Sequence, residues 1–189
     1  MRRRLLLTAI ATITLLAQAC SGYVELDVTF FTEMDLEKEV PADAAVDVDA
    51  EGGAYEFVHR VDVDLTEDSG QLDGQVSQVV LNEVAWRVPE NTMTGDLHGI
   101  TLLVGPLASL GPDDDNIVVL GTIPLVPAGK TINTTELATL PEGEAALKDH
   151  LMKMQFTLFV RGYAEIEDPE HLPIGKSLIE VDARGEIHR

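Results

Sequence analysis

The chain has little cysteine and little positive charge. One cysteine, Cys20, occurs among 189 residues, which excludes an internal disulfide and any zinc site built on cysteine pairs. Lysine and arginine number 13 against 33 aspartates and glutamates, so the formal net charge is −20. Because a surface this acidic repels phosphate backbones, we expect no nucleic-acid partner.

The motifs of common catalytic and metal sites are also missing from the sequence. The chain has five histidines, none of them in HxH or HExxH spacing, and it contains neither a Gly-x-Ser-x-Gly motif nor a glycine-rich phosphate loop. We therefore expect a protein that is not an enzyme. A hydrolase that uses two carboxylates is the least favoured alternative, since such a pair could hide among 33 acids.

The amino terminus has the order of an export signal. Arg2, Arg3 and Arg4 precede the apolar segment Leu5–Leu16, and Ala17-Gln18-Ala19 forms a small-x-small cleavage site. The apolar segment is shorter than the roughly 20 residues that cross a bilayer. We expect residues 1–19 to be removed, which moves the formal charge from −20 to −23 because three arginines leave with no acid.

The residue after this cleavage site is Cys20. The segment Ala17-Gln18-Ala19-Cys20 resembles the lipobox of bacterial lipoproteins, although that family usually has leucine at the position of Ala17 and a smaller residue than Gln18. The resemblance implies that Cys20 is lipidated, that residues 20–23 form a tether, and that the membrane is a partner through this anchor. In a Gram-negative source, Ser21 resembles the outer-membrane sorting pattern. The alternative is ordinary signal cleavage, which would leave Cys20 as a thiol.

Period-2 alternation of apolar and polar residues predicts strands along the rest of the chain. The segments with this pattern, bounded by glycine, proline or aspartate, are Val24–Phe30, Val61–Leu65, Val79–Val88, Leu97–Val104, Ile117–Ile123, Phe156–Ile166 and Ile179–Ala183. We expect a bulge near Asn82, an interruption at Gly162, and a further short strand around Val46 and Val48.

One helix is expected after Thr139. Thr139 and Glu142 fit a capping box, in which the two side chains satisfy each other's backbone amides. Glu144 and Lys148 stand four residues apart and form a favourable pair. Gly143 opposes the helix by about 1 kcal/mol relative to alanine. A narrow apolar seam follows at helical spacing, formed by Leu147 and Leu151.

Seven or eight short strands and one short helix predict a mainly β protein, an immunoglobulin-like antiparallel β-sandwich forming a single domain over residues 24–189. We expect Trp86, the one tryptophan, to anchor the core.

A family resemblance covers residues 117–187. Gly121-Thr122-Ile123-Pro124 is followed by Lys130–Thr135, a helix, a strand ending at Gly162, and Gly185-Glu186-Ile187. This order resembles the immunoglobulin-like sandwich of LEA14-type (water-stress and hypersensitive response) domains. The resemblance implies a small sandwich with a buffering or binding role and no catalytic residues.

Two acidic clusters are candidate calcium sites. Asp47, Asp49 and Glu51 precede Gly52 in the spacing of the first half of a calcium loop, but Val58 stands where the loop needs a bidentate glutamate. A second cluster, Asp113, Asp114 and Asp115, could chelate calcium from a loop tip. A third acidic group, favoured as an outward polar face, comprises Asp62, Asp64, Glu67, Asp68 and Asp73. No cofactor is required, and calcium is the one candidate.

These observations predict a lipid-anchored protein of the bacterial cell envelope, exported and non-catalytic, that binds an unknown protein or small ligand or has a structural role. The alternative from another class is a calcium-stabilised adhesion or ligand-binding module.

Overall fold

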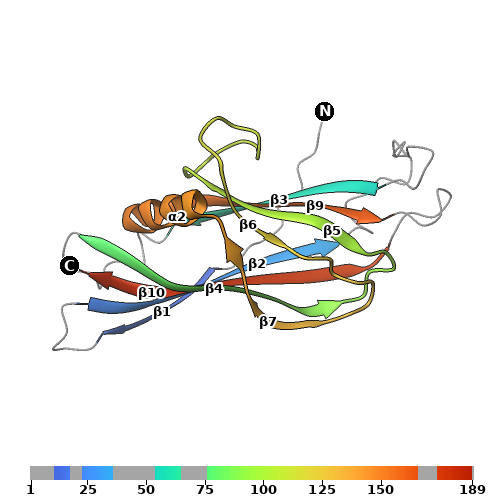
Figure 1. The fold of residues 1–189 in the computed structure, drawn as a ribbon, viewed down its shortest axis with the longest axis horizontal. Helices are drawn as coiled ribbons and strands as arrows, with labels where there is room; N and C mark the ends of the chain where they lie inside the picture. Colours follow the sequence, from blue (N-terminus) through green and yellow to red (C-terminus); the bar gives the residue numbers. More distant parts are fainter. Residues whose placement is uncertain (1–10, 18–22, 36–53, 65–75, 166–173, 189) are drawn as a thin grey trace.

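The structure is a computed structural model that describes residues 11–17, 23–35, 54–64, 76–165 and 174–188. In these residues the chain is mainly β and forms two layered sheets with one helix, α2 (Figure 1). Sheet A has the order β1-β2-β10-β4-β7, and sheet B has the order β3-β9-β5-β6-β8. The strands are β1 (Ala11–Ala17), β2 (Tyr23–Asp35), β3 (Ala54–Asp64), β4 (Gln78–Asn91), β5 (Leu97–Gly105), β6 (Val118–Ile123), β7 (Ile132–Glu136), β8 (Ala138–Thr139), β9 (Gln155–Glu165) and β10 (Lys176–His188).

All of the strand pairs are antiparallel, and the predicted β-sandwich is confirmed. Each segment predicted from alternation overlaps a strand. Four of the segments lie wholly inside a longer strand, and the other three extend one residue beyond theirs, at Leu65, Ile117 and Ile166. The bulge near Asn82 is confirmed as well, since Arg184 pairs with Glu83 while Gly185 pairs with Leu81, so Asn82 has no opposite residue. The short strand expected around Val46 and Val48 lies outside the described residues.

The sequence missed β7 and β8. Neither shows apolar alternation: the last four residues of β7, Asn133–Glu136, are all exposed, and β8 has two residues. Both lie at sheet edges, where a strand is held by backbone pairing on one side and needs little apolar surface.

The predicted interruption at Gly162 is wrong, because β9 runs unbroken from Gln155 to Glu165. Gly162 is buried, and a Cβ added there would lie 2.6 Å from Cζ of Phe57. Glycine at this position makes room for the aromatic ring that packs from β3, so it serves packing inside a strand and not a turn.

Helix α2 spans Pro141–Lys153, close to the prediction, but the capping box is wrong. Leu140 is the N-cap residue and no side chain caps it, while Thr139 lies in β8. Pro141 occupies the first helical turn, where its missing N–H costs nothing, so the helix begins there without a hydroxyl cap. The predicted pair is present: Nζ of Lys148 donates to Oε1 of Glu144 at 2.6 Å.

The helix packs between the sheets, against β6, β5 and β9 of sheet B and β4 of sheet A (Figure 1). Leu147 and Leu151 are buried in the shared core, as the apolar seam predicted. Gly143 faces the backbone of β6, and a Cβ added there would lie 2.2 Å from the carbonyl oxygen of Val119. The glycine that weakens the helix by propensity is therefore what permits its close approach to the sheet.

A single apolar core lies between the two sheets. Trp86 is buried at 3 % exposure, so its predicted role as a core anchor is confirmed. Across the inner face of sheet A, Trp86 pairs with Val181 and Val181 with Phe30, and Phe30 meets Phe156 of sheet B edge-to-face at 5.5 Å between ring centroids. This aromatic contact joins the two layers directly.

Strand β1 lies within the segment predicted to be an export signal. Residues Ala11–Ala17 pair with Phe30–Val24 at the edge of sheet A. The removal of residues 1–19 stays a prediction.

Candidate functional site

The predicted lipidation residue, Cys20, lies outside the described residues. Strand β2 begins at Tyr23, three positions further along the chain.

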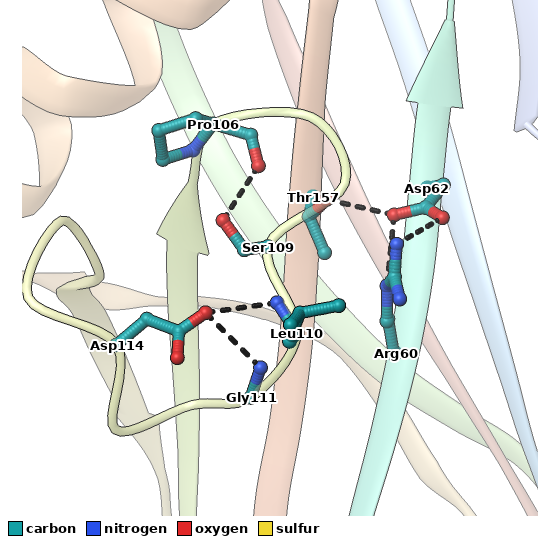
Figure 2. Close-up of polar contacts among 8 residues, drawn as sticks. All are labelled: Arg60, Asp62, Pro106, Ser109, Leu110, Gly111, Asp114 and Thr157. Atoms are coloured by element: carbon teal, nitrogen blue, oxygen red, sulfur yellow. Dashed lines mark hydrogen bonds and ion pairs between the residues drawn. The ribbon is translucent and has the colours of Figure 1, made fainter.

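The second predicted calcium cluster lies on the long loop between β5 and β6, residues 106–117 (Figure 1). One Oδ2 atom of Asp114 accepts the backbone N–H groups of Leu110 at 2.8 Å and Gly111 at 3.3 Å (Figure 2). The hydroxyl of Ser109 donates to the carbonyl of Pro106 at 2.7 Å. Asp114 thus acts as a side-chain acceptor that holds the turn, a common use of aspartate in loops.

Asp113 links the same loop to sheet B through an ion pair. Its Oδ1 atom lies 3.0 Å from Nη1 of Arg161 on β9, and Nε of Arg161 donates to Glu56 of β3 at 2.6 Å. The hydrogen bond to Glu56 raises the pKa of Arg161, with the charges of Glu56 and Asp113 adding to it. Arg161 is therefore shared by two carboxylates from different parts of the chain.

The outer face of sheet B also carries Asp62, the first member of the third acidic group. Asp62 accepts a 2.7 Å hydrogen bond from the hydroxyl of Thr157 and an ion pair of 2.6 Å from Nη2 of Arg60 (Figure 2). Asp64 accepts from Nε2 of Gln155 at 3.1 Å. Asp62 and Asp64 do lie on the outward face predicted for them, opposite the buried Val61 and Val63.

Calcium binding stays a prediction, and the structure gives two of these carboxylates protein partners. Asp113 binds Arg161, and Asp114 accepts hydrogen bonds from backbone amides. Asp115 is exposed on the same loop. Over the part of the chain that the structure describes, no three histidine, cysteine, aspartate or glutamate side chains gather as a metal site would require. The calcium candidates Asp47, Asp49 and Glu51 lie outside the described residues, as do Glu67, Asp68 and Asp73 of the third acidic group.

Sequence reasoning missed two carboxylates on the outer face of sheet A. Glu180 and Asp182 of β10 are 6 % and 7 % exposed. Arg87 of β4 forms an ion pair and a hydrogen bond with Glu180, and the hydroxyl of Thr29 donates to Asp182 at 2.7 Å. The sequence signal was present as Glu180 and Asp182 alternating with Ile179 and Val181, but alternation does not say that β10 is flanked on both sides.

Two histidines are also buried. His59 lies on the inner face of β3, and burial lowers its pKa from 6.5 to about 4. His150 of α2 packs against Phe156, and its pKa is lowered by burial and by the nearby charge of Lys153. Both imidazoles therefore favour the neutral form inside the fold.

Comparison with known proteins gives no match to a family, a curated protein or a solved structure. Within the described ranges, no helix is both long and apolar enough to cross a membrane.

Proposed function

We propose that the protein is exported, loses residues 1–19, and is held at the bacterial cell envelope by a lipid on Cys20, where its sandwich acts as a non-catalytic binding or structural module. One observation carries the proposal: three arginines, a twelve-residue apolar segment and Ala17-Gln18-Ala19 stand directly before the one cysteine. A thiol exported alone is a liability unless it is modified.

Two further features support a tethered module. Strand β2 begins three positions after Cys20, so a lipid there would be joined to the sandwich by a short tether. The charge of the processed chain, −23, keeps the domain soluble and away from an anionic lipid surface. In a Gram-negative cell, Ser21 favours the outer membrane as the location.

A binding or structural role, as opposed to catalysis, is supported by the way three exposed carboxylates are used. Asp62, Asp113 and Asp114 each accept hydrogen bonds that hold strands or loops in place. Carboxylates engaged in this way act as structural acceptors, which suits a rigid module that presents surfaces.

The anchor is tested by growing cells with an alkyne analogue of palmitate and by measuring the mass of the first tryptic peptide. We expect the wild-type chain to be labelled and to begin at an acylated Cys20. Cys20→Ala should abolish the label, and the neighbouring Ser21→Ala variant should keep it. Label that survives in Cys20→Ala, or an unmodified Cys20 at the N-terminus, would reject the anchor.

A further inference from the structure

One edge of sheet A becomes a long unpaired strand once the proposed processing is complete. Strand β1 is the outermost strand of this sheet, and it pairs with Val24–Phe30 of β2. Cleavage after Ala19 would detach β1. The backbone donors and acceptors of Val24–Phe30 that point away from β10 would then have no partner strand.

Strand β2 is held in place independently of β1. It pairs with β10 over all thirteen of its residues, with no register shift. Val28 and Phe30 are buried in the core between the sheets. Removal of β1 should therefore leave β2 folded as a regular edge strand.

This edge lacks most of the features that keep edge strands from pairing. Proteins protect such edges with short strands, prolines, bulges and charged side chains. Strand β2 is long and has neither a proline nor a bulge along its pairing with β10. At the opposite edge of sheet A, β7 has five residues and its pairing with β4 contains a register shift. The charges of β2 are thus the feature that decides which strand can pair with it.

The alternation of β2 restricts how a second copy of the same strand can pair with it. Val28 and Phe30 face the core, whereas Asp27 and Thr29 lie on the outer face, where Arg184 and Asp182 of β10 contact them. Residues directly opposite in antiparallel strands lie on the same face of the sheet. A symmetric pair of β2 strands must therefore be centred on a residue, so that core-facing residues stay opposite one another.

The acidic residues of β2 select one of these centres. Like charges directly opposed across two strands are destabilising. Each of the four centres within two residues of Val28 opposes two acids. The opposed pairs are Glu25 and Asp27 for the centre Leu26, two Asp27 residues for Asp27, Glu25 and Glu33 for Thr29, and Asp27 and Glu33 for Phe30.

Pairing centred on Val28 opposes no two charges. Each acid then stands opposite an uncharged residue of the second copy. The resulting pairs are Asp27 with Thr29, Glu25 with Phe31, and Glu33 with Tyr23. The sequence of β2 is therefore complementary to itself in this register.

The strand that covers this edge before processing has the same pattern. In β1, Thr14 stands opposite Asp27 and Ile13 stands opposite Val28. A second β2 centred on Val28 places a threonine, Thr29, opposite Asp27 and a β-branched apolar residue, Val28, opposite Val28. The second copy thus supplies the residue types that β1 supplies at these two positions.

Cations of β10 offset the acids that this pairing brings near each other. The two Asp27 residues become diagonal neighbours, about 7–8 Å apart. Nε of Arg184 lies 3.8 Å from Oδ2 of Asp27, and Nζ of Lys176 lies 3.7 Å from Oε1 of Glu33. Each copy therefore brings a partner cation for these two acids.

We propose that, once residues 1–19 are removed, a second copy of this chain covers the β2 edge in a two-fold dimer whose β2 strands pair antiparallel about Val28. The pairing runs from Tyr23 to Glu33 and joins the two copies of sheet A into one continuous sheet. Each pair of residues occurs twice, because the contact is two-fold symmetric. The inference rests on the proposed function, since the edge becomes available only after cleavage.

The test uses the full-length gene product with a carboxyl-terminal tag, purified from membranes in detergent. Mass measurement of its N-terminus first establishes whether residues 1–19 are absent. Micelles are kept in large excess over protein, so that two lipid anchors rarely share one micelle. Sedimentation over a dilution series then gives the dimer fraction, and hydrogen exchange is followed in the β2 and β7 fragments.

We expect the processed protein to dimerise, with exchange at the outward amides of β2 slowing as the protein concentration rises. Exchange in β7 should not depend on concentration. Phe31→Glu places an acid opposite Glu25 of the second copy and should weaken dimerisation about fivefold, whereas Phe31→Lys should strengthen it about fivefold. These values take roughly twofold for each cross-strand charge pair, which occurs twice.

The matched controls carry the same charges at the opposite edge of sheet A. Thr134→Glu and Thr134→Lys change an exposed residue of β7 and should leave dimerisation unchanged. Phe31 also stands opposite Glu180 of β10, so Phe31→Glu is expected to lower stability, which a thermal melt measures. Phe31→Lys carries the opposite charge and tests the register even where Phe31→Glu fails to fold.

Each contrary outcome is distinct. A processed protein that stays monomeric at every concentration overturns the dimer and leaves the proposed function intact. A dimer with equal dissociation constants in wild type and Phe31→Lys, or without protection of β2, uses another surface and also overturns the inference. An unprocessed chain rejects the proposed function instead, because β1 then still covers the edge.

Discussion

Both sheets carry an aspartate directly opposite a threonine on the neighbouring strand, yet the two pairs are buried in opposite ways. In sheet A, Thr29 of β2 donates to Asp182 of β10 at 2.7 Å, and the aspartate is 7 % exposed. In sheet B, Thr157 of β9 donates to Asp62 of β3 at 2.7 Å, and there the threonine is fully buried while the Asp62 side chain is 46 % exposed.

The difference follows from where each strand lies in its sheet. Strand β10 runs between β2 and β4, so neighbours on both sides cover its outward side chains, whereas β3 is the edge strand of sheet B. The same hydrogen bond should therefore contribute more to stability around β10 than around β3, because burial strengthens electrostatic contacts and raises the cost of breaking them.

The largest expected effect is a loss of stability in acid, caused by His59 on the inner face of β3. Because burial lowers the pKa of His59 from 6.5 to about 4, the neutral imidazole is favoured in the folded state. As the pH falls through 6.5 the unfolded chain binds a proton on His59, whereas the folded chain binds one only near pH 4. The free energy of unfolding should therefore fall by about 3 kcal/mol between pH 6.5 and pH 4. Urea unfolding at a series of pH values should show this loss. His59→Leu should flatten this part of the pH profile. Equal slopes in wild type and His59→Leu would contradict it.

Gly143→Ala tests the helix that joins the two sheets. The added Cβ would meet the backbone of Val119 and Leu120, so α2 must move away from β6. We expect a loss of about 2 to 3 kcal/mol, the scale of overpacking, despite the better helix propensity of alanine. Thermal melts would measure it. Gly111→Ala is the control, since no atom lies within 4 Å of its added Cβ. A Gly143→Ala variant as stable as wild type would show that the close approach is unimportant.

Glu180→Ala probes the outer face of sheet A. It leaves Arg87 without its buried carboxylate partner, and we expect a cost of about 2 kcal/mol by urea unfolding at neutral pH. The matched change on sheet B, Glu56→Ala, removes an exposed partner of Arg161 and should cost about 1 kcal/mol or less. Similar costs for the two variants would break the distinction between central and edge strands.

Asp62→Ala tests the aspartate–threonine pair of sheet B. The buried hydroxyl of Thr157 loses its acceptor. Because the Asp62 side chain is 46 % exposed, water can enter the space that it leaves and take part of that role, so we expect a loss of about 1 kcal/mol. Asp62→Asn keeps an acceptor and should recover most of the stability. Asp182→Ala on β10 should cost more than Asp62→Ala, and the reverse order would refute the comparison.

The smallest effect is expected at Asp114. Asp114→Ala removes the acceptor of two loop amides and should cost up to about 1 kcal/mol, with faster hydrogen exchange at Leu110 and Gly111. Melting temperatures with millimolar calcium and with EDTA should agree in both proteins. A calcium-dependent rise that is lost in Asp114→Ala would instead support the calcium-stabilised module.

Much of the fold could be predicted because core strands alternate in sequence. Val61 and Val63 in β3 and Ile179 and Val181 in β10 are buried as that pattern requires. Two kinds of feature could not be predicted. One is a strand whose side chains stay exposed, such as β7, and the other is a residue whose role depends on a partner distant in sequence. The local sequence predicts a break at Gly162, because the Phe57 ring that occupies the space of a Cβ there is remote in sequence.

The candidate sites were less predictable than the fold. Asp113 and Asp114 were identified as acidic residues on a loop, but nothing in the local sequence pairs Asp113 with Arg161, 48 positions away. The burial of Glu180 and Asp182 could not be predicted, because an acidic residue on the outward face of a strand is expected to be solvated until the flanking strands are known.

The sequence by itself determined the strand pattern, the helix with its buried leucines, and the arrangement of arginines, apolar segment and Cys20 on which the proposed anchor rests. These depend on local periodicity and residue order. Only the tertiary structure decided that β10 lies at the centre of its sheet and β3 at an edge, and therefore which of their charges are buried. Burial depends on neighbours brought together from distant positions, and the free energy of a charge in a protein depends on that burial.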